Sequence, residues 1–471
     1  MNRNLGIFIF HNDLRINDNL GLAQISKMCD VIMPVFIFTP EQISSSNKYR
    51  SMPAIEFMLA QLAILDSELR HHANSSGGIG GGKLYMFYGS TTRVMTKLIQ
   101  AMKPIVVCNN ANYTPFALDR DSTLKAACER LGCEYMLCED YGMYGIGAVT
   151  RNQADPIKGI YKKFTPYYNA AKRTPPDKPL RYQLGKLYNG TIKGTVQLAD
   201  VRRKLNVKAI NIESATQVLN SIHKQANYNR DRDKLAIATS RISAHMKFGA
   251  ISPREVYWKV HSLGAKSSDL VKQLYWREFY MNIAWAYPYV FQQRNFNANF
   301  HANWKSSGDM TELVAWCKGK TGFPIIDACM RELNTTGYMH NRGRLIVAGF
   351  LTKLLGWHWK FGEMYFATRL RDYDPAQNNG NWQFVAGSGV DQQPYFRMFN
   401  PWLQSKDHDP DCVYIKHWCP EYADFPNNVL HNEAKLREYI SENGLSSKIT
   451  PPVVAYEKQR DSTKKRYLRH V

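Results

Sequence analysis

TGFPIIDACMRELNTTGYMHNRGR (residues 321–344) and RDYDPAQNNGNWQF (residues 371–384) are the stretches of sequence that decide the fold. A third stretch, DQQPYFRMFNP, follows them at residues 391–401. Together they combine Asn, Asp, Arg, Gly and Trp with few simple apolar repeats. A helical core that only has to pack does not need these polar side chains, so the block predicts a binding site rather than packing alone.

Helical patterns precede this block and continue through it. LVKQLYWREFYMNIAWAY (residues 270–287) and GRLIVAGFLTKLLGW (residues 343–357) place aliphatic and aromatic residues at helical spacing. The pattern turns helical at about residue 205 and stays so. We therefore expect residues 205–471 to form the larger domain, and that domain to be all-α.

The first third of the chain has a different pattern. Helix-like segments such as Ala54–Arg70 alternate with compact apolar runs rich in Ile, Val and Phe, namely Leu5–Phe10, Val31–Phe38, Lys83–Tyr88 and Ile105–Cys108. Such alternation predicts a doubly wound parallel sheet, a Rossmann-like α/β domain over residues 1–133. Residues 134–204 mix Pro, Gly, Tyr and Lys with little periodicity and are expected to connect the two domains.

Length and composition limit the possible functions. A chain of 471 residues favours two domains, and a net charge of +21 suits a polyanionic partner, although a basic protein without that specialisation is the alternative. Ten Trp and 27 Tyr offer stacking surfaces for nucleic acid or a flat cofactor. The nine Cys include no C-x-x-C pair, so no metal site is predicted. The N-terminus does not read as a signal peptide and no window suits a membrane helix, so we expect a soluble intracellular protein.

The block at residues 321–401 resembles the flavin-binding core of the photolyase/cryptochrome family, and the resemblance extends more weakly over almost the whole chain. Within that family it looks most like the class I-type photolyases that repair cyclobutane pyrimidine dimers. The resemblance implies an FAD enzyme that is driven by blue light and acts on UV-damaged DNA, double- or single-stranded. It also implies a monomer located where DNA is, in the cytoplasm of a prokaryote or virus-infected cell or in a nucleus.

The family's FAD-binding residues have matches along the helical domain. The matching positions are Tyr228, Thr239, Ser240, Arg241, Ile242, Ser243, Arg277, Arg344, Asp372, Asp374 and Asn378. Hydroxyl and backbone N–H groups at a helix start suit a pyrophosphate, which the segment from Thr239 would supply. Asp372 can fix Arg344 beside the flavin, or the two can form a purely structural ion pair. Asn378 matches the residue at the flavin N5 edge, where Asn is the photolyase choice, although cryptochromes of the DASH type keep it too.

Three tryptophans match the family's electron-transfer chain. Trp382 and Trp359 correspond to its proximal and middle members, and Trp304 is the best candidate for the member nearest solvent. A Trp in a helical core is more often only packing. The motifs around Trp382 and Trp359 favour function for these two.

The lesion pocket has matches as well as departures. Trp276 matches its aromatic wall and Asn341 the amide that contacts the pyrimidine edge. Gln273 stands where dimer-repairing members usually have Glu, Phe384 where a second Trp is usual, and Leu345 where Met is common. Charged residues in matching segments are assigned to DNA phosphates, namely Arg342, Arg397 and Lys406.

Two rival functions and the antenna stay open. A cryptochrome-like photoreceptor would bind flavin without repair. A (6-4) photolyase is supported by Gln273 but opposed by Asn341 and Leu345, which stand where catalytic histidines are expected. A second, light-harvesting chromophore could be a folate, a deazaflavin or absent, because His11 precedes the Asp-Leu-Arg signature and Thr114 replaces an acidic residue.

Overall fold

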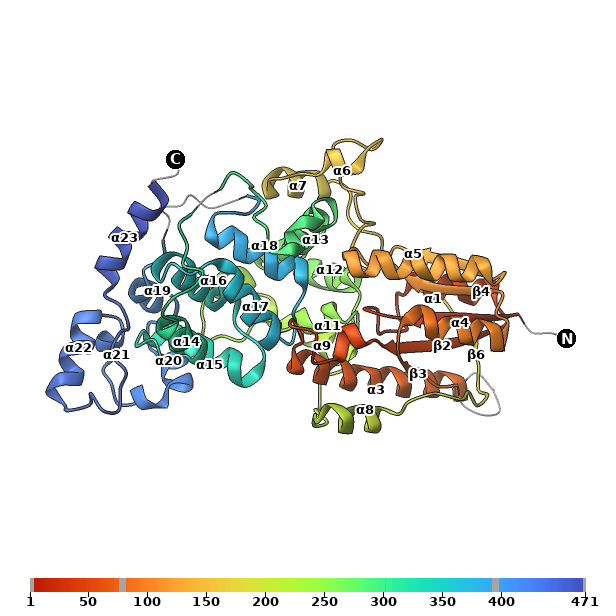
Figure 1. Cartoon of the computed structure of the whole chain (residues 1–471), viewed down its shortest axis with the longest axis horizontal. Coiled ribbons are helices and arrows are strands. Elements are labelled where there is room, and N and C mark those ends of the chain that lie inside the picture. Colours follow the sequence, from red (N-terminus) through yellow and green to blue (C-terminus); the bar gives the residue numbers. More distant parts are fainter. Residues whose placement is uncertain (1–3, 76–81, 301, 392–397, 469–471) are drawn as a thin grey trace. The chain divides into compact units, whose positions relative to one another are not determined.

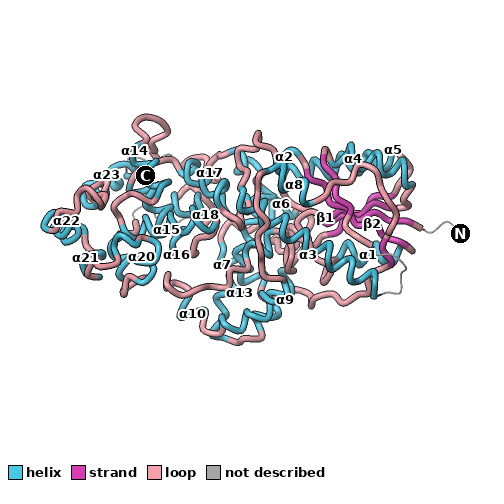
Figure 2. The backbone as a smooth tube through the Cα atoms, turned by 90° about the horizontal axis from the view of Figure 1, so that it is seen from below, coloured by secondary structure: helices cyan, strands magenta, loops and turns pink. Residues whose placement is uncertain are grey.

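The computed structural model describes residues 4–75, 82–300, 302–391 and 398–468. Within it the chain forms two compact units (Figure 1). The first comprises Met1–Ala226 and Ile242–Pro288, and the second comprises Asn227–Arg241 and Tyr289–Val471. Figure 2 shows the strands gathered in one sheet, with helices and loops making up the rest.

The sheet of the first unit is parallel, with strands in the order β3-β2-β1-β4-β5 and β6 paired with β2. Its strands are β1 Leu5–Phe10, β2 Val31–Phe38, β3 Tyr85–Tyr88, β4 Val106–Asn110, β5 Glu134–Cys138 and β6 Lys186–Leu187. The chain reverses direction across the sheet between β1 and β4, as in doubly wound folds.

Alternate side chains of the strands enter two separate cores. Phe8, Phe36 and Cys108 face α1 (Leu20–Met28) and α3 (Met52–Ser75). Ile7, Val35 and Val107 face α4 (Thr91–Met102) and α5 (Pro115–Arg130). Both faces of the sheet are therefore covered, which explains why its strands read as continuous apolar runs. The predicted fold class, a doubly wound parallel sheet followed by a helical remainder, is confirmed.

Further helices complete the first unit. They are α2 Pro40–Ile43, α6 Pro156–Gly159, α7 Phe164–Ala171, α8 Leu198–Leu205, α9 Ala215–Ser221, η1 Ile222–Gln225, α11 Ser243–Lys247, α12 Pro253–His261, η2 Ala265–Ser267 and α13 Ser268–Ala286. The predicted connector, residues 134–204, thus contains two strands and three short helices. The predicted boundaries 1–133, 134–204 and 205–471 remain predictions.

A buried ionic network joins α12 to the loops that follow β1 and β5. The guanidinium of Arg254 donates to Asp140 Oδ1 at 2.6 Å and to Asp18 Oδ2 at 3.0 Å. Arg15 pairs with the second oxygen of Asp140, and Ser252 donates to Asp18. Every side chain in these ion pairs is at most 6% exposed. We call the set Arg15, Asp18, Asp140 and Arg254 the closed network.

The second unit is helical. Its helices are α10 Tyr228–Asp231, α14 Thr311–Lys318, α15 Pro324–Thr336, α16 Asn341–Gly349, the π-helix η4 Phe350–Leu354, α17 Trp359–Arg369, α18 Pro375–Ala386, α19 Pro401–His408, α20 Val413–Trp418, η5 Pro420–Tyr422, α21 Asn427–Leu430, α22 Glu433–Glu442 and α23 Tyr456–Leu468, while η3 spans Pro288–Gln292. No helix in the described ranges is both long and apolar enough to cross a membrane.

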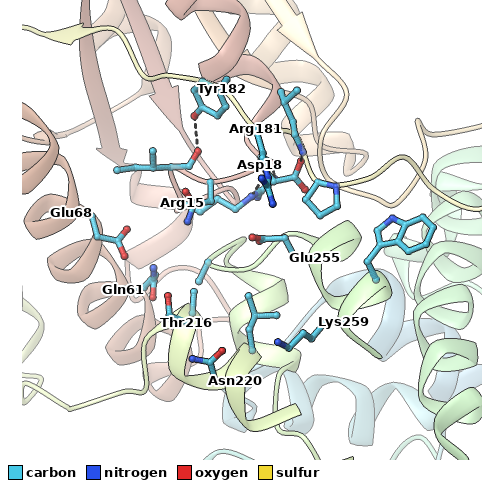
Figure 3. Close-up of a pocket in the computed structure, with 18 of the residues that line it drawn as sticks. Arg15, Asp18, Gln61, Glu68, Arg181, Tyr182, Thr216, Asn220, Glu255 and Lys259 are labelled. Atoms are coloured by element: carbon cyan, nitrogen blue, oxygen red, sulfur yellow. Dashed lines mark hydrogen bonds between the residues drawn. The ribbon is translucent and has the colours of Figure 1, made fainter. Parts of the chain in front are cut away.

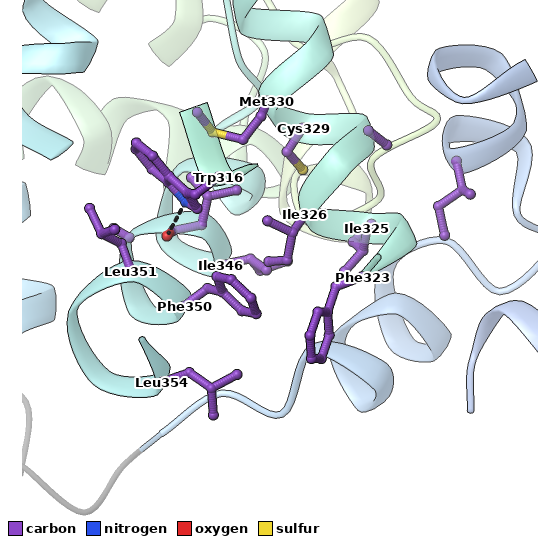
Figure 4. Close-up of a cluster of buried hydrophobic side chains, with 14 of the residues drawn as sticks. Trp316, Phe323, Ile325, Ile326, Cys329, Met330, Ile346, Phe350, Leu351 and Leu354 are labelled. Atoms are coloured by element: carbon purple, nitrogen blue, oxygen red, sulfur yellow. Dashed lines mark hydrogen bonds between the residues drawn. The ribbon is translucent and has the colours of Figure 1, made fainter. Parts of the chain in front are cut away.

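One apolar core holds this unit together, and Figure 4 shows its centre. Trp316 of α14 is fully buried there, and its indole N–H donates to Val347 O at 3.1 Å. Phe323 and Phe350 pack edge to face at 4.9 Å. This core positions α15 to α18, the helices that carry the polar block of the sequence.

Candidate functional site

Arg344 and Asp372 form an ion pair in the second unit. Arg344 Nη2 donates to Asp372 Oδ2 at 2.8 Å, and Arg344 Nε donates to Met339 O at 2.9 Å. Burial opposes the charge on Arg344, but Asp372 outweighs it and the pKa of the guanidinium is raised. The other oxygen, Asp372 Oδ1, is buried and has no hydrogen-bond partner in the described structure. A buried acceptor left unpaired is a place where a ligand donor would be stabilised.

Tyr338 is in contact with two guanidinium cations and one hydroxyl group. The guanidinium carbons of Arg241 and Arg344 lie 4.8 Å and 5.6 Å from its ring centroid. Its phenol oxygen lies 2.9 Å from Thr239 Oγ1, and burial raises its pKa. Glu332 is 3.7 Å from Arg241. Two arginines beside a hydroxyl suit a bound anion, and we call Arg241, Tyr338, Arg344 and Asp372 the open cluster.

The predicted phosphate segment runs from one unit into the other. Tyr228 is buried at the start of α10, and Ser240 is half-buried beside Arg241, whose φ is +50°. Ile242 and Ser243 begin α11, in the first unit.

Asp374 and Asn378 lie at the start of α18. Asp374 Oδ1 accepts from the N–H groups of Ala376 and Gln377, so it caps the helix. Asn378 Nδ2 donates to Glu363 O at 2.9 Å and to Glu363 Oε1 at 3.0 Å. Because both amide hydrogens go to Glu363, the oxygen of Asn378 is the atom left to face a ligand.

The three predicted tryptophans all lie in the second unit. Trp382 is buried against Phe366 at 5.0 Å and Trp316 at 6.1 Å. Its indole lies against Gly362, where a Cβ would come within 2.1 Å of the ring. That position therefore requires glycine.

Trp359 and Trp304 share a neighbour, His358. The imidazole centroid is 5.5 Å from Trp359 and 4.8 Å from Trp304. Desolvation lowers the pKa of His358 to about 4, so its ring is neutral near pH 7. Trp359 Nε1 donates to Asn295 Oδ1 at 2.9 Å, and the half-buried Trp304 donates to Tyr467 Oη at 3.2 Å.

The predicted lesion and flavin residues of α13 lie in the first unit. Trp276 stacks on Phe164 with ring centroids 3.6 Å apart and planes 4° apart, so one face of this indole is covered. Gln273 is half-buried one turn earlier. Arg277 donates to Tyr141 O at 3.1 Å and to Glu278 Oε1 at 3.2 Å.

The other residues predicted to contact DNA differ in their exposure and in whether they already interact with other residues of the protein. Asn341 is exposed at the start of α16, while Leu345 and Phe384 pack half-buried against the core. Arg342 Nη2 pairs with Asp233 at 2.8 Å. Lys406 is exposed and forms no ion pair with a described residue. Arg397 lies outside the described residues.

The antenna positions lack the charges expected of a folate site. Thr114 caps α5 by accepting from Ala117 N at 3.3 Å. Burial, with Arg120 nearby, holds the pKa of His11 well below its usual value. The second chromophore therefore stays a prediction.

Sequence reasoning missed four residues that position those it identified. Glu363 holds Asn378, Tyr338 joins Thr239 to the arginines, His358 lies between two tryptophans, and Phe164 backs Trp276. The only sequence signals were their places in GYMHN, WHWKFGE and YKKFTPYY. None of these says which distant residue is the partner.

Comparison with known proteins gives consistent matches over both units. Residues 7–182 match the family described as DNA photolyase, and residues 270–469 match the FAD binding domain of DNA photolyase. A deoxyribodipyrimidine photo-lyase of Alkalihalophilus pseudofirmus is 34% identical over 81% of this chain and 82% of its own length.

Two crystal structures are similar to almost the entire chain. An archaeal photolyase from Sulfolobus tokodaii, solved with two FAD molecules, is 34% identical, with a TM-score of 0.82 over 99% of this chain and 100% of its own. A bacterial class III photolyase from Agrobacterium tumefaciens is 28% identical, with a TM-score of 0.87 over 100% of this chain and 98% of its own.

Proposed function

The chain belongs to the DNA photolyase family, and we propose that it repairs cyclobutane pyrimidine dimers under blue or near-UV light. Bound FAD, when reduced, supplies light absorption and an electron that passes to a lesion flipped out of the DNA and then returns. No net redox change results, so the enzyme is a lyase. The class I-type assignment is part of this proposal and rests on the residues matched above.

The orientation of Asn378 is the single observation that carries the proposal. Glu363 takes both amide hydrogens, so the side chain presents its oxygen to any group at the flavin N5 edge. An oxygen there accepts a hydrogen bond from N–H but repels a bare nitrogen lone pair. Asn378 would therefore favour a flavin that carries hydrogen at N5 over an oxidised one. Glu363 acts as a positioning residue for that preference.

The open cluster fits the remaining polar parts of FAD. Arg344 would supply a positive charge near the isoalloxazine, with Asp372 fixing its direction. The unpaired Asp372 Oδ1 would accept from a donor of the cofactor. Thr239, Ser240 and Arg241 would hold the pyrophosphate, because Arg241 is more than half exposed and its charge is only partly balanced by Glu332.

The tryptophans would return the flavin to its reduced form. Trp382 is buried, Trp359 fully so, and Trp304 only partly, which suits a path from the interior to solvent. His358 is a ring neighbour of Trp359 and Trp304, and its neutral imidazole adds no charge to oppose a positive charge on either indole.

DNA would be bound by charge and the lesion by stacking and amide contacts. Phe164 holds the indole of Trp276 in a fixed plane, which lowers the entropy lost when a flipped base stacks on it. Asn341 is exposed and can reach a pyrimidine edge. Lys406, Arg342 and Arg397 would contact phosphates, helped by the +21 charge of the chain.

A repair assay on the reduced holoenzyme tests the proposal. A dimer-containing oligonucleotide is illuminated with the protein, and dimer loss is followed together with the flavin spectrum. We expect light-dependent splitting with no net change in flavin oxidation state. Flavin photoreduction without dimer loss would indicate a photoreceptor instead, and splitting of (6-4) products alone would reassign the lesion.

Two Trp variants test the return path. Trp382→Phe should retain FAD but slow its photoreduction by more than about tenfold, a barrier increase of about 1.4 kcal/mol. Trp316→Phe is the matched control, because Trp316 lies 6.1 Å from Trp382 and packs in the core but is not assigned to the electron path. Repair by enzyme that was chemically reduced beforehand should be unaffected in both. Equal photoreduction rates would mean that electrons take another route.

A further inference from the structure

A pocket of about 680 Å³ lies within the first unit, and none of the residues assigned above to FAD, lesion or phosphate lines it. Figure 3 shows its walls, which come from the loop after β1, α3, the segment 179–182, α9 and α12. Its volume is in the range of small-molecule sites.

The deep wall holds an acceptor that has no partner. Gln61 of α3 is 2% exposed. Its amide N–H donates to Leu14 O at 3.0 Å, whereas its oxygen is buried and makes no hydrogen bond in the described structure. Buried amide oxygens are normally paired, so this one points to a donor that the protein itself does not provide.

Two carboxylates add to this acceptor surface. Glu68 lies seven residues after Gln61, so the two share one side of α3, and Glu255 reaches the pocket from α12. Desolvation raises the pKa of both Glu68 and Glu255. Neither forms an ion pair with a described residue, although Glu255 Oε2 accepts from Ser252 N at 3.1 Å. A ligand that donates hydrogen bonds would meet acceptors on two sides.

The cations of the pocket are divided between wall and rim. Arg15 lies in the wall, where it is already bound to Asp18 O, Gly249 O and Asp140. Lys259 and Arg181 are exposed and form no ion pair among the described residues. Apolar surface between these groups comes from Ile16, Leu180, Leu219 and Trp258.

We propose that this pocket binds a purine-type heterocycle of the guanine class that carries an anionic tail. Carboxylates and an amide oxygen only accept hydrogen bonds, so they select a ring edge with adjacent N–H donors. Guanine presents its ring N–H beside its exocyclic amino group, whereas adenine places a ring acceptor beside its amino group. The apolar residues cover the ring faces, and Lys259 with Arg181 neutralises the tail.

The test uses GMP as the probe on the full-length, flavin-loaded protein, with affinity measured by isothermal titration calorimetry. We expect GMP to bind more tightly than IMP, which lacks the exocyclic amino group, and both to bind more tightly than AMP. Glu68→Gln keeps the shape and removes an acceptor charge, so it should weaken GMP binding roughly tenfold or more.

Matched variants separate the site from general effects. Glu56→Gln changes a half-buried glutamate of the same helix that does not line the pocket, and it should leave GMP affinity unchanged. Lys259→Ala should weaken GMP more than guanosine, which has no phosphate. Flavin content and dimer repair should be the same in all variants. No GMP binding at about 1 mM, equal affinities for GMP and AMP, or equal losses in Glu68→Gln and Glu56→Gln would each overturn the proposal.

Discussion

Each unit of the molecule contains a cluster of arginines and carboxylates, but the two clusters differ in how far they are buried and paired. In the closed network of the first unit, Arg15 and Arg254 are 5% and 6% exposed and their carboxylate partners are buried. In the open cluster of the second unit, Arg344 and Arg241 are 27% and 56% exposed, and Asp372 keeps one oxygen unpaired.

The two sets contain the same residue types but differ in hydrogen-bond saturation, and this property separates a structural network from a candidate site. Burying charge is costly unless every partner is in place, and the closed network meets that condition. In the open cluster one carboxylate oxygen has no partner among the described residues and two guanidinium groups are partly exposed, so the cluster can form further hydrogen bonds to a ligand.

Breaking the closed network should give the largest effect. Arg254→Met leaves Asp18 and Asp140 without this buried partner, so we expect the free energy of unfolding to fall by about 3–5 kcal/mol. Urea denaturation followed by circular dichroism measures it. Arg93→Met, an exposed arginine of α4, is the control and should change little. A loss below about 1 kcal/mol would show that the network contributes only specificity.

Breaking the open cluster should act on ligand binding first. Arg344→Met should weaken FAD by roughly 10–100-fold, since a charged hydrogen bond contributes about 1.5–3 kcal/mol. Flavin fluorescence titration of the apoprotein gives the affinity. Arg331→Met removes the bidentate pair with Glu421 in the same unit and should leave FAD affinity intact. Equal losses of affinity in both variants would make Arg344 a structural residue.

Asn341 and Asn378 offer the same comparison between two amides. The amide of Asn378 donates to Glu363, whereas Asn341 is exposed and is proposed to contact the DNA lesion. Asn341→Ala should weaken binding of dimer-containing DNA by about 1–3 kcal/mol and binding of undamaged DNA much less. Fluorescence anisotropy on the two DNAs is the measurement. The assignment of Asn341 to the lesion pocket fails if both DNAs lose the same amount.

The smallest expected effect is on the salt dependence of DNA binding, where a cation without an ion-pair partner among the described residues is compared with one that has such a partner. Lys406→Ala should lower the logarithmic salt slope for undamaged DNA by about 0.9, the amount for one phosphate contact. Arg342→Ala should lower it less, because Asp233 already balances Arg342. A salt titration of both variants gives the two slopes. Identical changes would mean that the Arg342–Asp233 pair opens on DNA.

Local patterns predicted most of the fold. The runs Leu5–Phe10 and Val31–Phe38 are strands at the predicted bounds, because each is buried on both faces. Strand β5 was missed and assigned to the connector. It lies at the sheet edge with its residues half-buried or exposed, so it lacks a continuous apolar signature.

The other features that the sequence did not predict depend on contacts between residues that are far apart in the chain. Helical periodicity identified α13 but not the compact unit to which it belongs. Arg254 gave no sign in sequence that its partners would be Asp18 and Asp140. In the site, the motif supplied Asn378 and Arg344, while Glu363 and Phe164 became visible only through their contacts.

The closed network also sets an order of events during protein synthesis. Asp18 and Asp140 leave the ribosome long before Arg254, since 114 residues separate positions 140 and 254. At roughly 5–20 residues per second, that interval is about 6–23 s. Throughout it Asp140 can pair with Arg15, but Arg254, the partner of Asp18 and of the other Asp140 oxygen, has not yet been made. Asp18 and one oxygen of Asp140 therefore gain this partner only after α12 has been synthesised, later than every strand of the sheet.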